Sequence, residues 1–206
     1  MSGGTRIGLD LDNTLISYEE VFRTYAQRRG LIEGGFRGGK DEVRQALRRQ
    51  DDGELKWQQL QGAVYGKGVA EAALFDGADA FLRRASALGR EIVIVSHKTE
   101  FGHYDPDRIN LREAALAWMR AQGFFDPDGL GVAPDKVRFT ATRGEKLALI
   151  RELAVDFFID DLPEVLEHPE FPPEVTGILF TRGATSESTY PRIAAHWRDI
   201  ARMVLG

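Results

Sequence analysis

The sequence contains no cysteine, and this absence excludes several classes of protein at once. Without thiols there is no disulfide framework, no thiolate zinc site and no cysteine nucleophile. A chain of 206 residues with 43% apolar side chains does not need such cross-links, because it is long enough to bury a core of its own. Its length is that of one domain, or of one domain that carries a sizeable insertion. The lack of cysteine leads us to expect a cytoplasmic protein.

Long apolar runs and an excess of positive charge are also missing. No segment approaches the roughly 18 uninterrupted apolar residues that a membrane-spanning helix needs. The first apolar stretch is broken by Asp10 and Asp12, unlike the apolar region of a signal peptide. The 27 basic and 32 acidic residues give a net charge of −5. We therefore expect neither a membrane nor a nucleic acid as a partner.

What the chain does have is an alternation of short apolar runs and amphipathic stretches. Runs such as Ile92-Val93-Ile94-Val95 are typical of parallel strands that are buried on both faces. Alternating strands and helices predict an α/β fold with a doubly wound parallel sheet. The expected strands are residues 6–11, 91–96, 137–141, 155–160 and 176–180. The expected helices are residues 78–88, 108–122, one that begins at the capping box 142–145, and a last one with Ile193, Trp197, Ile200, Ala201 and Val204 on its docking face.

One segment interrupts this alternation. Residues 16–73 lack a convincing strand and show helical patterns at 19–29, 41–49 and 54–64. Such an insertion after the first strand predicts a small lid over the carboxyl ends of the strands, where ligands bind in these sheets. The predicted domains are an α/β core of residues 1–15 and 74–206 and a helical cap of residues 16–73. Residues 34–40 match Gly-x-x-x-x-Gly-Lys, but Asp41 follows where a phosphate-binding loop requires Ser or Thr.

Two carboxylates, Asp10 and Asp12, stand where the first apolar run leaves the predicted sheet. Aspartate is depleted in strands and costly to bury without a partner, so both residues require an explanation. One explanation is catalysis. The other is an ordinary turn, because Asp-Asn-Thr is common turn chemistry. The pair alone does not decide between the two.

Similar signals appear at three other places that face the same crevice of a doubly wound sheet. Ser96 ends the second strand, although a serine there is also a common helix cap. Lys146 lies in the first turn of a helix, where it opposes the helix dipole; either a nearby anion or simple solvation explains it. Asp160 and Asp161 place two like charges side by side after a very apolar strand, an arrangement that a cation would stabilise.

Taken together, these places resemble the four sequence motifs of the haloacid dehalogenase superfamily of phosphohydrolases. The run Asp-Leu-Asp-Asn-Thr at 10–14 is similar to the first motif, Asp-x-Asp-x-Thr, and Ser96 to the second. Lys146 is similar to the lysine of the third motif, and Asp160-Asp161 to the acidic pair of the fourth. The resemblance covers essentially the whole predicted core. It implies a phosphatase-type hydrolase whose lid occupies the family's first cap position.

The resemblance also implies a role for each residue. Asp10 would be the nucleophile that forms an aspartyl-phosphate, and Asp12 the general acid and then the general base. Mg²⁺ would be held by Asp10, the backbone carbonyl of Asp12 and Asp160, with Asp161 acting directly or indirectly. The residues expected to bind the phosphoryl group are Thr14, Ser96, His97 and Lys146. Lys98, next to His97, is expected to border the crevice.

Three functional interpretations follow. The leading one is a Mg²⁺-dependent phosphomonoesterase that acts on a small phosphorylated metabolite. The second is a phosphotransferase, or an accessory domain of a biosynthetic complex, on the same fold. The third is a phospho-accepting signalling module, which also uses aspartates, a Ser or Thr and a lysine on a parallel sheet. The candidates for substrate contact in the lid are Tyr18, Glu19, Arg37, Lys40, Trp57, Gln58, Gln61, Tyr65 and Lys67.

Overall fold

The computed structural model describes residues 4–102, 104, 107–126, 128–183 and 188–206. The chain forms two compact units. Unit 1 consists of Met1–Ile16, Leu74–Lys98 and Gln122–Gly206, and unit 2 of Ser17–Ala73 and Thr99–Ala121. The division differs from the predicted domains at two places: residues 99–121 group with the predicted cap and not with the predicted core, and Ile16, the first residue of the predicted cap, belongs to unit 1. Within the described residues, no helix combines the length and the apolar composition needed to cross a membrane.

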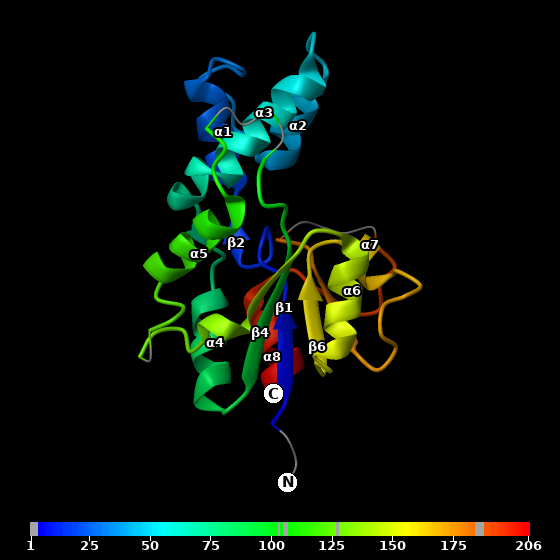
Figure 1. Ribbon diagram of the computed structural model, residues 1–206. Coiled ribbons are helices and arrows are strands. Elements are labelled where there is room, and N and C mark those ends of the chain that lie inside the picture. The colour runs from blue at the N-terminus through cyan, green and yellow to red at the C-terminus, as the bar shows by residue number, and fades with distance from the viewer. Residues whose placement is uncertain (1–3, 103, 105–106, 127, 184–187) are drawn as a thin grey trace. The chain divides into compact units, whose positions relative to one another are not determined.

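Unit 1 is built on a six-stranded sheet whose neighbouring strands are all parallel (Figure 1). The order across the sheet is β5-β4-β1-β6-β7-β8. This confirms the doubly wound parallel fold that the sequence predicts. The strands are β1 (Arg6–Leu9), β4 (Glu91–His97), β5 (Val137–Thr140), β6 (Phe157–Asp160), β7 (Thr176–Phe180) and β8 (Ile193–Ala194).

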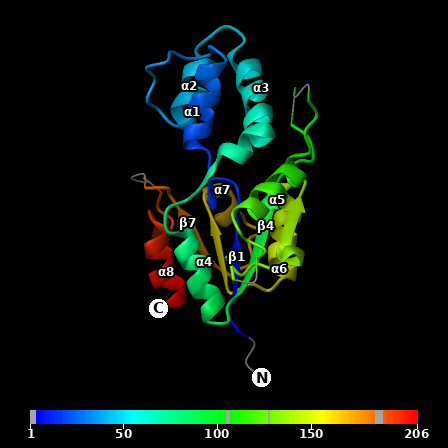
Figure 2. The same cartoon turned by 90° about the vertical axis from the view of Figure 1, so that its left-hand side faces the viewer.

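Helices cover both faces of this sheet (Figures 1 and 2). On one face, α4 (Ala78–Ala87) lies beside α8 (Trp197–Leu205), and the rings of Phe81 and Trp197 are 5.0 Å apart. On the other, α6 (Arg143–Glu152) and the short α7 (Pro163–Leu166) bury Leu147, Ile150 and Val165 against β4 and β6. A short 3₁₀ turn, η2 (Pro134–Lys136), precedes β5.

The last helix is shorter than predicted. Ile193 belongs to β8 and not to the docking face of the final helix, which begins only at Trp197. The sixth strand was not predicted, because two residues are too few to show a strand pattern in the sequence. Trp197, Ile200 and Val204 are buried as expected.

Unit 2 is helical. It contains α1 (Glu19–Arg28), α2 (Lys40–Arg48), α3 (Gly53–Tyr65), the 3₁₀ turn η1 (Lys67–Glu71) and α5 (Leu111–Ala121). Aromatic rings form part of its core: Phe22 stacks on Trp57 at 4.9 Å, and Tyr18 meets Tyr65 edge-on at 4.9 Å. The indole of Trp118 on α5 donates a hydrogen bond of 2.8 Å to the carbonyl of Ala72. This buried bond helps to explain why α5 groups with residues 17–73.

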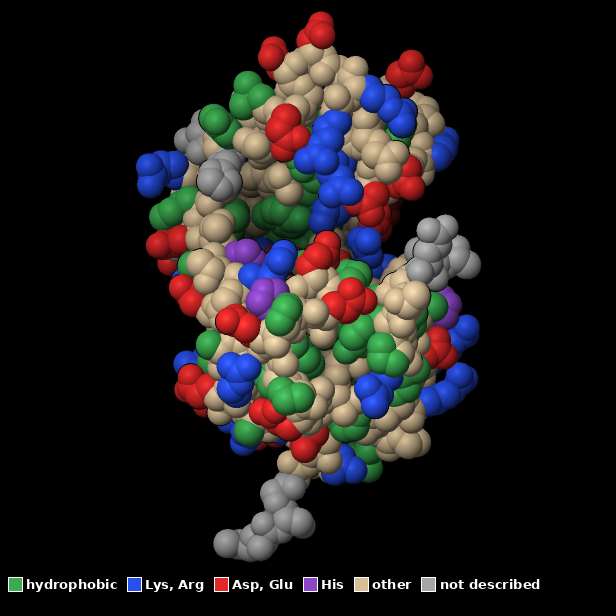
Figure 3. Space-filling view, turned by 90° about the vertical axis from the view of Figure 1, so that its right-hand side faces the viewer, with side chains coloured by type: hydrophobic (Ala, Val, Ile, Leu, Met, Phe, Trp, Pro, Cys, Tyr) green, Lys and Arg blue, Asp and Glu red, His purple; other side chains and the backbone are tan. Residues whose placement is uncertain are grey.

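The chain passes between the units at two short strands, β2 (Ile16–Ser17) and β3 (Ala73–Leu74), which pair with each other. The sequence did not predict these strands, since each is only two residues long. On the surface, the Lys and Arg side chains of the face seen in Figure 3 lie among Asp and Glu side chains. This mixture agrees with the small net charge.

Candidate active site

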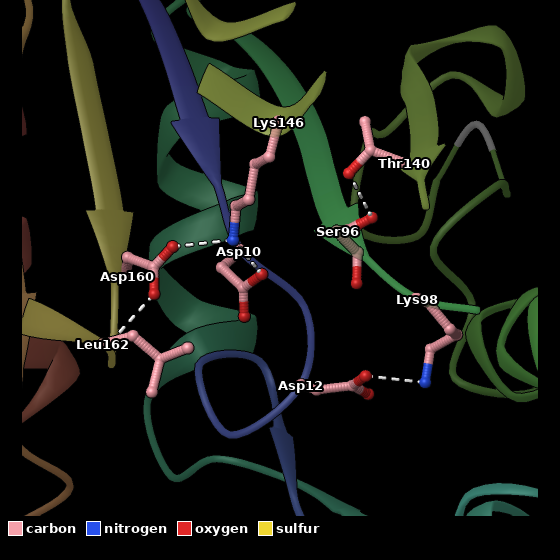
Figure 4. A network of polar contacts seen from close by, with 8 residues as sticks. All are labelled: Asp10, Asp12, Ser96, Lys98, Thr140, Lys146, Asp160 and Leu162. Carbon is pink, nitrogen blue, oxygen red and sulfur yellow. Dashed lines mark hydrogen bonds and ion pairs between the residues drawn. The ribbon is translucent and has the colours of Figure 1, made fainter. Parts of the chain in front are cut away.

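A buried lysine joins two aspartates at the carboxyl ends of neighbouring strands of unit 1 (Figure 4). The ammonium nitrogen of Lys146 lies 2.6 Å from Oδ1 of Asp10 and 2.7 Å from Oδ2 of Asp160. Asp10 directly follows β1, and its backbone N–H donates to the carbonyl of Ile159 on β6 at 2.9 Å. Asp160 is the last residue of β6, and Lys146 lies on α6. The structure thus brings together residues that are far apart in the sequence.

The position of this cluster follows from the strand order. The chain runs from β1 to β4 and β5 on one side, and then crosses over to β6 on the other side of β1. In doubly wound sheets, ligands bind outside the carboxyl ends of the strands at the point where the order reverses. That point lies between β1 and β6, where Asp10 and Asp160 stand.

Local structure places the lysine. Oγ1 of Thr142 accepts a hydrogen bond of 3.2 Å from the backbone N–H of Glu145, so the predicted cap begins α6. The Glu145 carboxylate accepts from the backbone of Ala141 at 2.7 Å, one residue earlier than in a regular capping box. Lys146 therefore lies in the first turn of a capped helix. Its ammonium nitrogen is 5.4 Å from the ring centre of Phe158.

A glycine in β1 makes room for this ring. Gly8 pairs with Phe158 across the two strands, and a β-carbon on Gly8 would lie 2.5 Å from the ring. Any larger residue at this position would push Phe158 out of its place beneath the lysine.

Burial dominates the electrostatics of the cluster. It raises the pKa of Asp10 to about 7, although the Lys146 ammonium opposes the rise; the charge of Asp160 adds to it. Burial by itself would lower the pKa of Lys146, but the charges of Asp10 and Asp160 outweigh this effect and raise it above its ordinary value. Lys146 therefore remains an ammonium, and its charge only partly offsets the effect of burial on Asp10.

The donor set of the cluster fits a hard divalent cation. One carboxylate oxygen from each of Asp10, Asp160 and Asp161 lies within 4.8 Å of the others. Asp160 is held in place, because its Oδ1 accepts a hydrogen bond of 2.9 Å from the backbone N–H of Leu162. Oxygen ligands in this number suit Mg²⁺, which keeps several waters when it binds to proteins. A bound cation would stabilise the ionised form of Asp10, which burial disfavours.

Two of the residues predicted to bind phosphate carry buried hydroxyl groups without a partner. Ser96 is 1% exposed and Thr14 is fully buried. Neither Ser96 Oγ nor Thr14 Oγ1 has a hydrogen-bond partner among the described residues. A buried hydroxyl that lacks a partner is costly, so a ligand that accepts its hydrogen bond is favoured. Figure 4 shows the Ser96 side chain between the Asp10 cluster and Lys98.

His97, also predicted to bind phosphate, is exposed, and its ring contacts the backbone. Its Nε2 lies 2.9 Å from the carbonyl oxygen of Ala141, so this nitrogen carries the proton that it donates. Side chains alternate along a strand, and His97 therefore points away from the side on which Ser96 is buried.

A second ion pair holds Asp12. Its Oδ2 lies 2.6 Å from the ammonium nitrogen of Lys98, whose side chain is 3% exposed. The sequence placed Lys98 near the crevice but did not predict this partner. The sequence contained one indication of this position. Lys98 is two residues after Ser96, and residues two apart along an extended chain point to the same side.

No family model and no curated protein matches this sequence. Solved structures do. A haloacid dehalogenase-like hydrolase of Streptococcus pneumoniae is 14% identical with a TM-score of 0.62, over 98% of this chain and 99% of that one. A haloacid dehalogenase superfamily hydrolase of Geobacter sulfurreducens is 11% identical with a TM-score of 0.56, over 98% and 96%. A hydrolase of the same kind from Entamoeba histolytica is 13% identical with a TM-score of 0.55, over 98% and 100%.

The chain has the haloacid dehalogenase-like fold. The strand order also differs from that of the phospho-accepting signalling modules, which were the third interpretation of the sequence. When the six strands of the sheet are numbered in chain order, their order across the sheet is 3-2-1-4-5-6, whereas receiver domains have the order 2-1-3-4-5. In this haloacid dehalogenase-like fold, Asp10, Lys146 and the acidic pair Asp160-Asp161 meet at a single place, and Asp12 pairs separately with Lys98.

Proposed function

We propose that this protein is a Mg²⁺-dependent phosphohydrolase that cleaves a small phosphorylated metabolite through an aspartyl-phosphate. One observation carries the proposal: the Asp10 carboxylate is buried at the switch point of the sheet, beside Lys146 and the cation-binding set Asp160 and Asp161. Lys146 contacts Oδ1 of Asp10, which leaves Oδ2 as the oxygen that attacks. The unpartnered hydroxyl of Ser96 supplies a donor for a phosphoryl oxygen.

In the first half of the reaction, an oxygen of Asp10 attacks phosphorus and the bond from phosphorus to the ester oxygen breaks. Asp12 gives its proton to the departing oxygen, so an alcohol leaves and the phosphoryl group stays on Asp10. Lys146 and Ser96 donate to the phosphoryl oxygens as charge spreads over them. A bound Mg²⁺ would supply further positive charge to the same oxygens.

In the second half, water attacks the phosphorus of the aspartyl-phosphate. Asp12, now ionised, takes a proton from that water, and the bond between phosphorus and the Asp10 oxygen breaks. Inorganic phosphate leaves and Asp12 is protonated again. The two halves therefore use the same carboxylate first as an acid and then as a base.

The proposal is tested by measuring phosphate release from phosphorylated sugars, nucleotides and small acids, with Mg²⁺ or with a chelator. We expect release from at least one substrate class, and we expect the chelator to abolish it. Transfer of the phosphoryl group to an added alcohol without release of phosphate would favour a phosphotransferase. No release and no transfer from any class would contradict the proposal.

Mg²⁺ is expected to stabilise the fold. Binding of a cation relieves the repulsion among Asp10, Asp160 and Asp161, and any ligand that binds only the folded state raises Tm. We expect millimolar Mg²⁺ to raise Tm by several degrees, and the rise to disappear in Asp160→Ala. Asp135→Ala, which removes a carboxylate of η2, is the matched control and retains the rise. A wild-type melting curve that ignores Mg²⁺ would remove the cation from the proposal.

We also propose that unit 2 serves as a cap that selects the substrate. It contains an open pocket of about 160 Å³ that is lined by residues of α3, of α5 and of the loop before α5: Gln58, Gln61, Gly62, Tyr65, Thr99, Gly102 and Leu111. The glutamine amides and the Tyr65 hydroxyl provide donors and acceptors for a polar group. Trp57, in contrast, is 3% exposed and stacked on Phe22, so it belongs to the core of the unit.

This difference predicts two kinds of variant. Gln61→Ala should change the ratio of the kcat/KM values for two phosphorylated metabolites by about tenfold. Tm should stay unchanged, because the substitution removes an amide that lines the pocket and no side chain of the core. Trp57→Ala should lower Tm and depress all substrates in proportion, since a large core side chain is lost. The measurement is kcat/KM for two substrates together with Tm. Equal proportional losses in Gln61→Ala would contradict the selecting cap.

A further inference from the structure

Lys98 is a buried, charged residue that is held by a backbone hydrogen bond and by an ion pair. It follows β4 directly, and its backbone N–H donates to the carbonyl of Thr140 on β5 at 3.0 Å. Its side chain is 3% exposed and ends 2.6 Å from the Asp12 carboxylate. Burying an ammonium is costly unless an opposite charge compensates for it, so the pair with Asp12 is what makes this position tenable.

Asp12 stands apart from the other carboxylates. In Figure 4 its side chain points toward Lys98, whereas the side chains of Asp10 and Asp160 converge on Lys146. Each group has its own lysine. The Asp12 carboxylate is therefore held by Lys98, a different lysine from the one that binds Asp10 and Asp160.

That direction matters for proton transfer. A general acid works only when its carboxylate reaches the atom that receives the proton, and errors of about 0.5 Å are harmful. Asp12 lies in the tight turn after β1, where Asn13 has a left-handed φ of 60° and donates its backbone N–H to Ile16 at 2.9 Å. This turn fixes the backbone, but it leaves the side-chain torsions of Asp12 to be fixed by a contact.

We propose that Lys98 is a positioning residue for Asp12: its ammonium donates to Oδ2 of Asp12 whether the carboxyl group is ionised or protonated, and this contact orients the other oxygen, Oδ1, to exchange protons with the leaving oxygen and with water. This inference rests on the proposed function. In this proposal Lys98 acts through Asp12 and does not itself bind the substrate. Its loss should therefore reproduce the effects of losing Asp12 itself, in weaker form.

The test compares an alkyl phosphate with an aryl phosphate whose leaving group needs no proton. kcat/KM reports the steps up to formation of the phosphoenzyme, so it isolates the help that Asp12 gives to the leaving group. In Lys98→Met we expect kcat/KM to fall about 100-fold for the alkyl phosphate and less than about fivefold for the aryl phosphate. Asp12→Asn should show the same pattern, and the double variant should be no worse than Asp12→Asn alone.

Two further variants keep the result interpretable. Lys98→Arg retains the charge and should restore part of the alkyl activity; it also provides the measurement if Lys98→Met does not fold. Lys136→Met removes a lysine that pairs with Glu91 and lies outside the cluster, and its alkyl-to-aryl ratio should be that of the wild type. Equal losses on both substrates that follow Tm, or a wild-type ratio in both Lys98 variants, would overturn the proposal. Failure of the wild type to release phosphate from any substrate would instead count against the proposed function.

Discussion

Asp10→Asn is expected to abolish turnover, with kcat lowered at least about 10⁴-fold, while the protein remains folded. A carboxamide cannot attack phosphorus, and removal of a nucleophile typically costs many orders of magnitude. The fold should tolerate the change because Asn is nearly isosteric with Asp and because burial already disfavours the charge of Asp10. Lys146 keeps Asp160 as its partner in this variant.

The measurement is steady-state phosphate release, together with the mass of protein quenched during turnover. Wild-type protein should gain the mass of one phosphoryl group, and Asp10→Asn should not. Asp156→Asn is the matched control, because it makes the same substitution at a residue that precedes β6 and accepts from the backbone of Arg6. Activity of Asp10→Asn within tenfold of the wild type would contradict the assignment of the nucleophile.

The sequence predicted the parts of this fold that follow from long-range patterns. Strands such as β4 and β6 are buried on both faces and show as apolar runs, and the parallel order then brings Asp10, Lys146 and Asp160 to one switch point. Elements of two residues, such as β8, carry no pattern of their own. Ile193 fits the apolar face of a helix equally well, and only its pairing with Leu179 on β7 shows that it is a strand residue.

Site residues could be predicted where a residue type is unusual for its position in a strand or helix. Aspartates at strand ends and a lysine in the first turn of a helix are costly without partners, so each one signals a site. The pairing of Lys98 with Asp12 is different, because it depends on how the turn at Asn13 directs one side chain. The grouping of residues 99–121 with unit 2 depends likewise on tertiary contacts, among them the buried hydrogen bond of Trp118 with Ala72 and the ion pair of Lys67 with Asp107. None of these contacts leaves a periodic signal in the sequence.

Lys146→Met is expected to have the largest effect on stability. The substitution removes an ammonium that is 2% exposed and lies 2.6 Å from Asp10 and 2.7 Å from Asp160. Both carboxylates then remain buried near each other without their common partner. Removing one member of a buried ion pair costs about 3–5 kcal/mol. For a chain of this size we expect Tm to fall by roughly 10 °C or more, and activity to be lost as well.

The cause of this loss can be separated from a simple packing defect. If carboxylate repulsion is responsible, neutralising one partner in Lys146→Met/Asp160→Asn should restore much of the stability, and Mg²⁺ should raise Tm more in Lys146→Met than in the wild type. A packing defect would respond to neither change. Lys136→Met, whose ion pair with Glu91 is partly exposed, should cost less than about 1 kcal/mol and serves as the control for losing a lysine. A fall in Tm that persists in the double variant and ignores Mg²⁺ would show that Lys146 does not act as the counter-charge of Asp10 and Asp160.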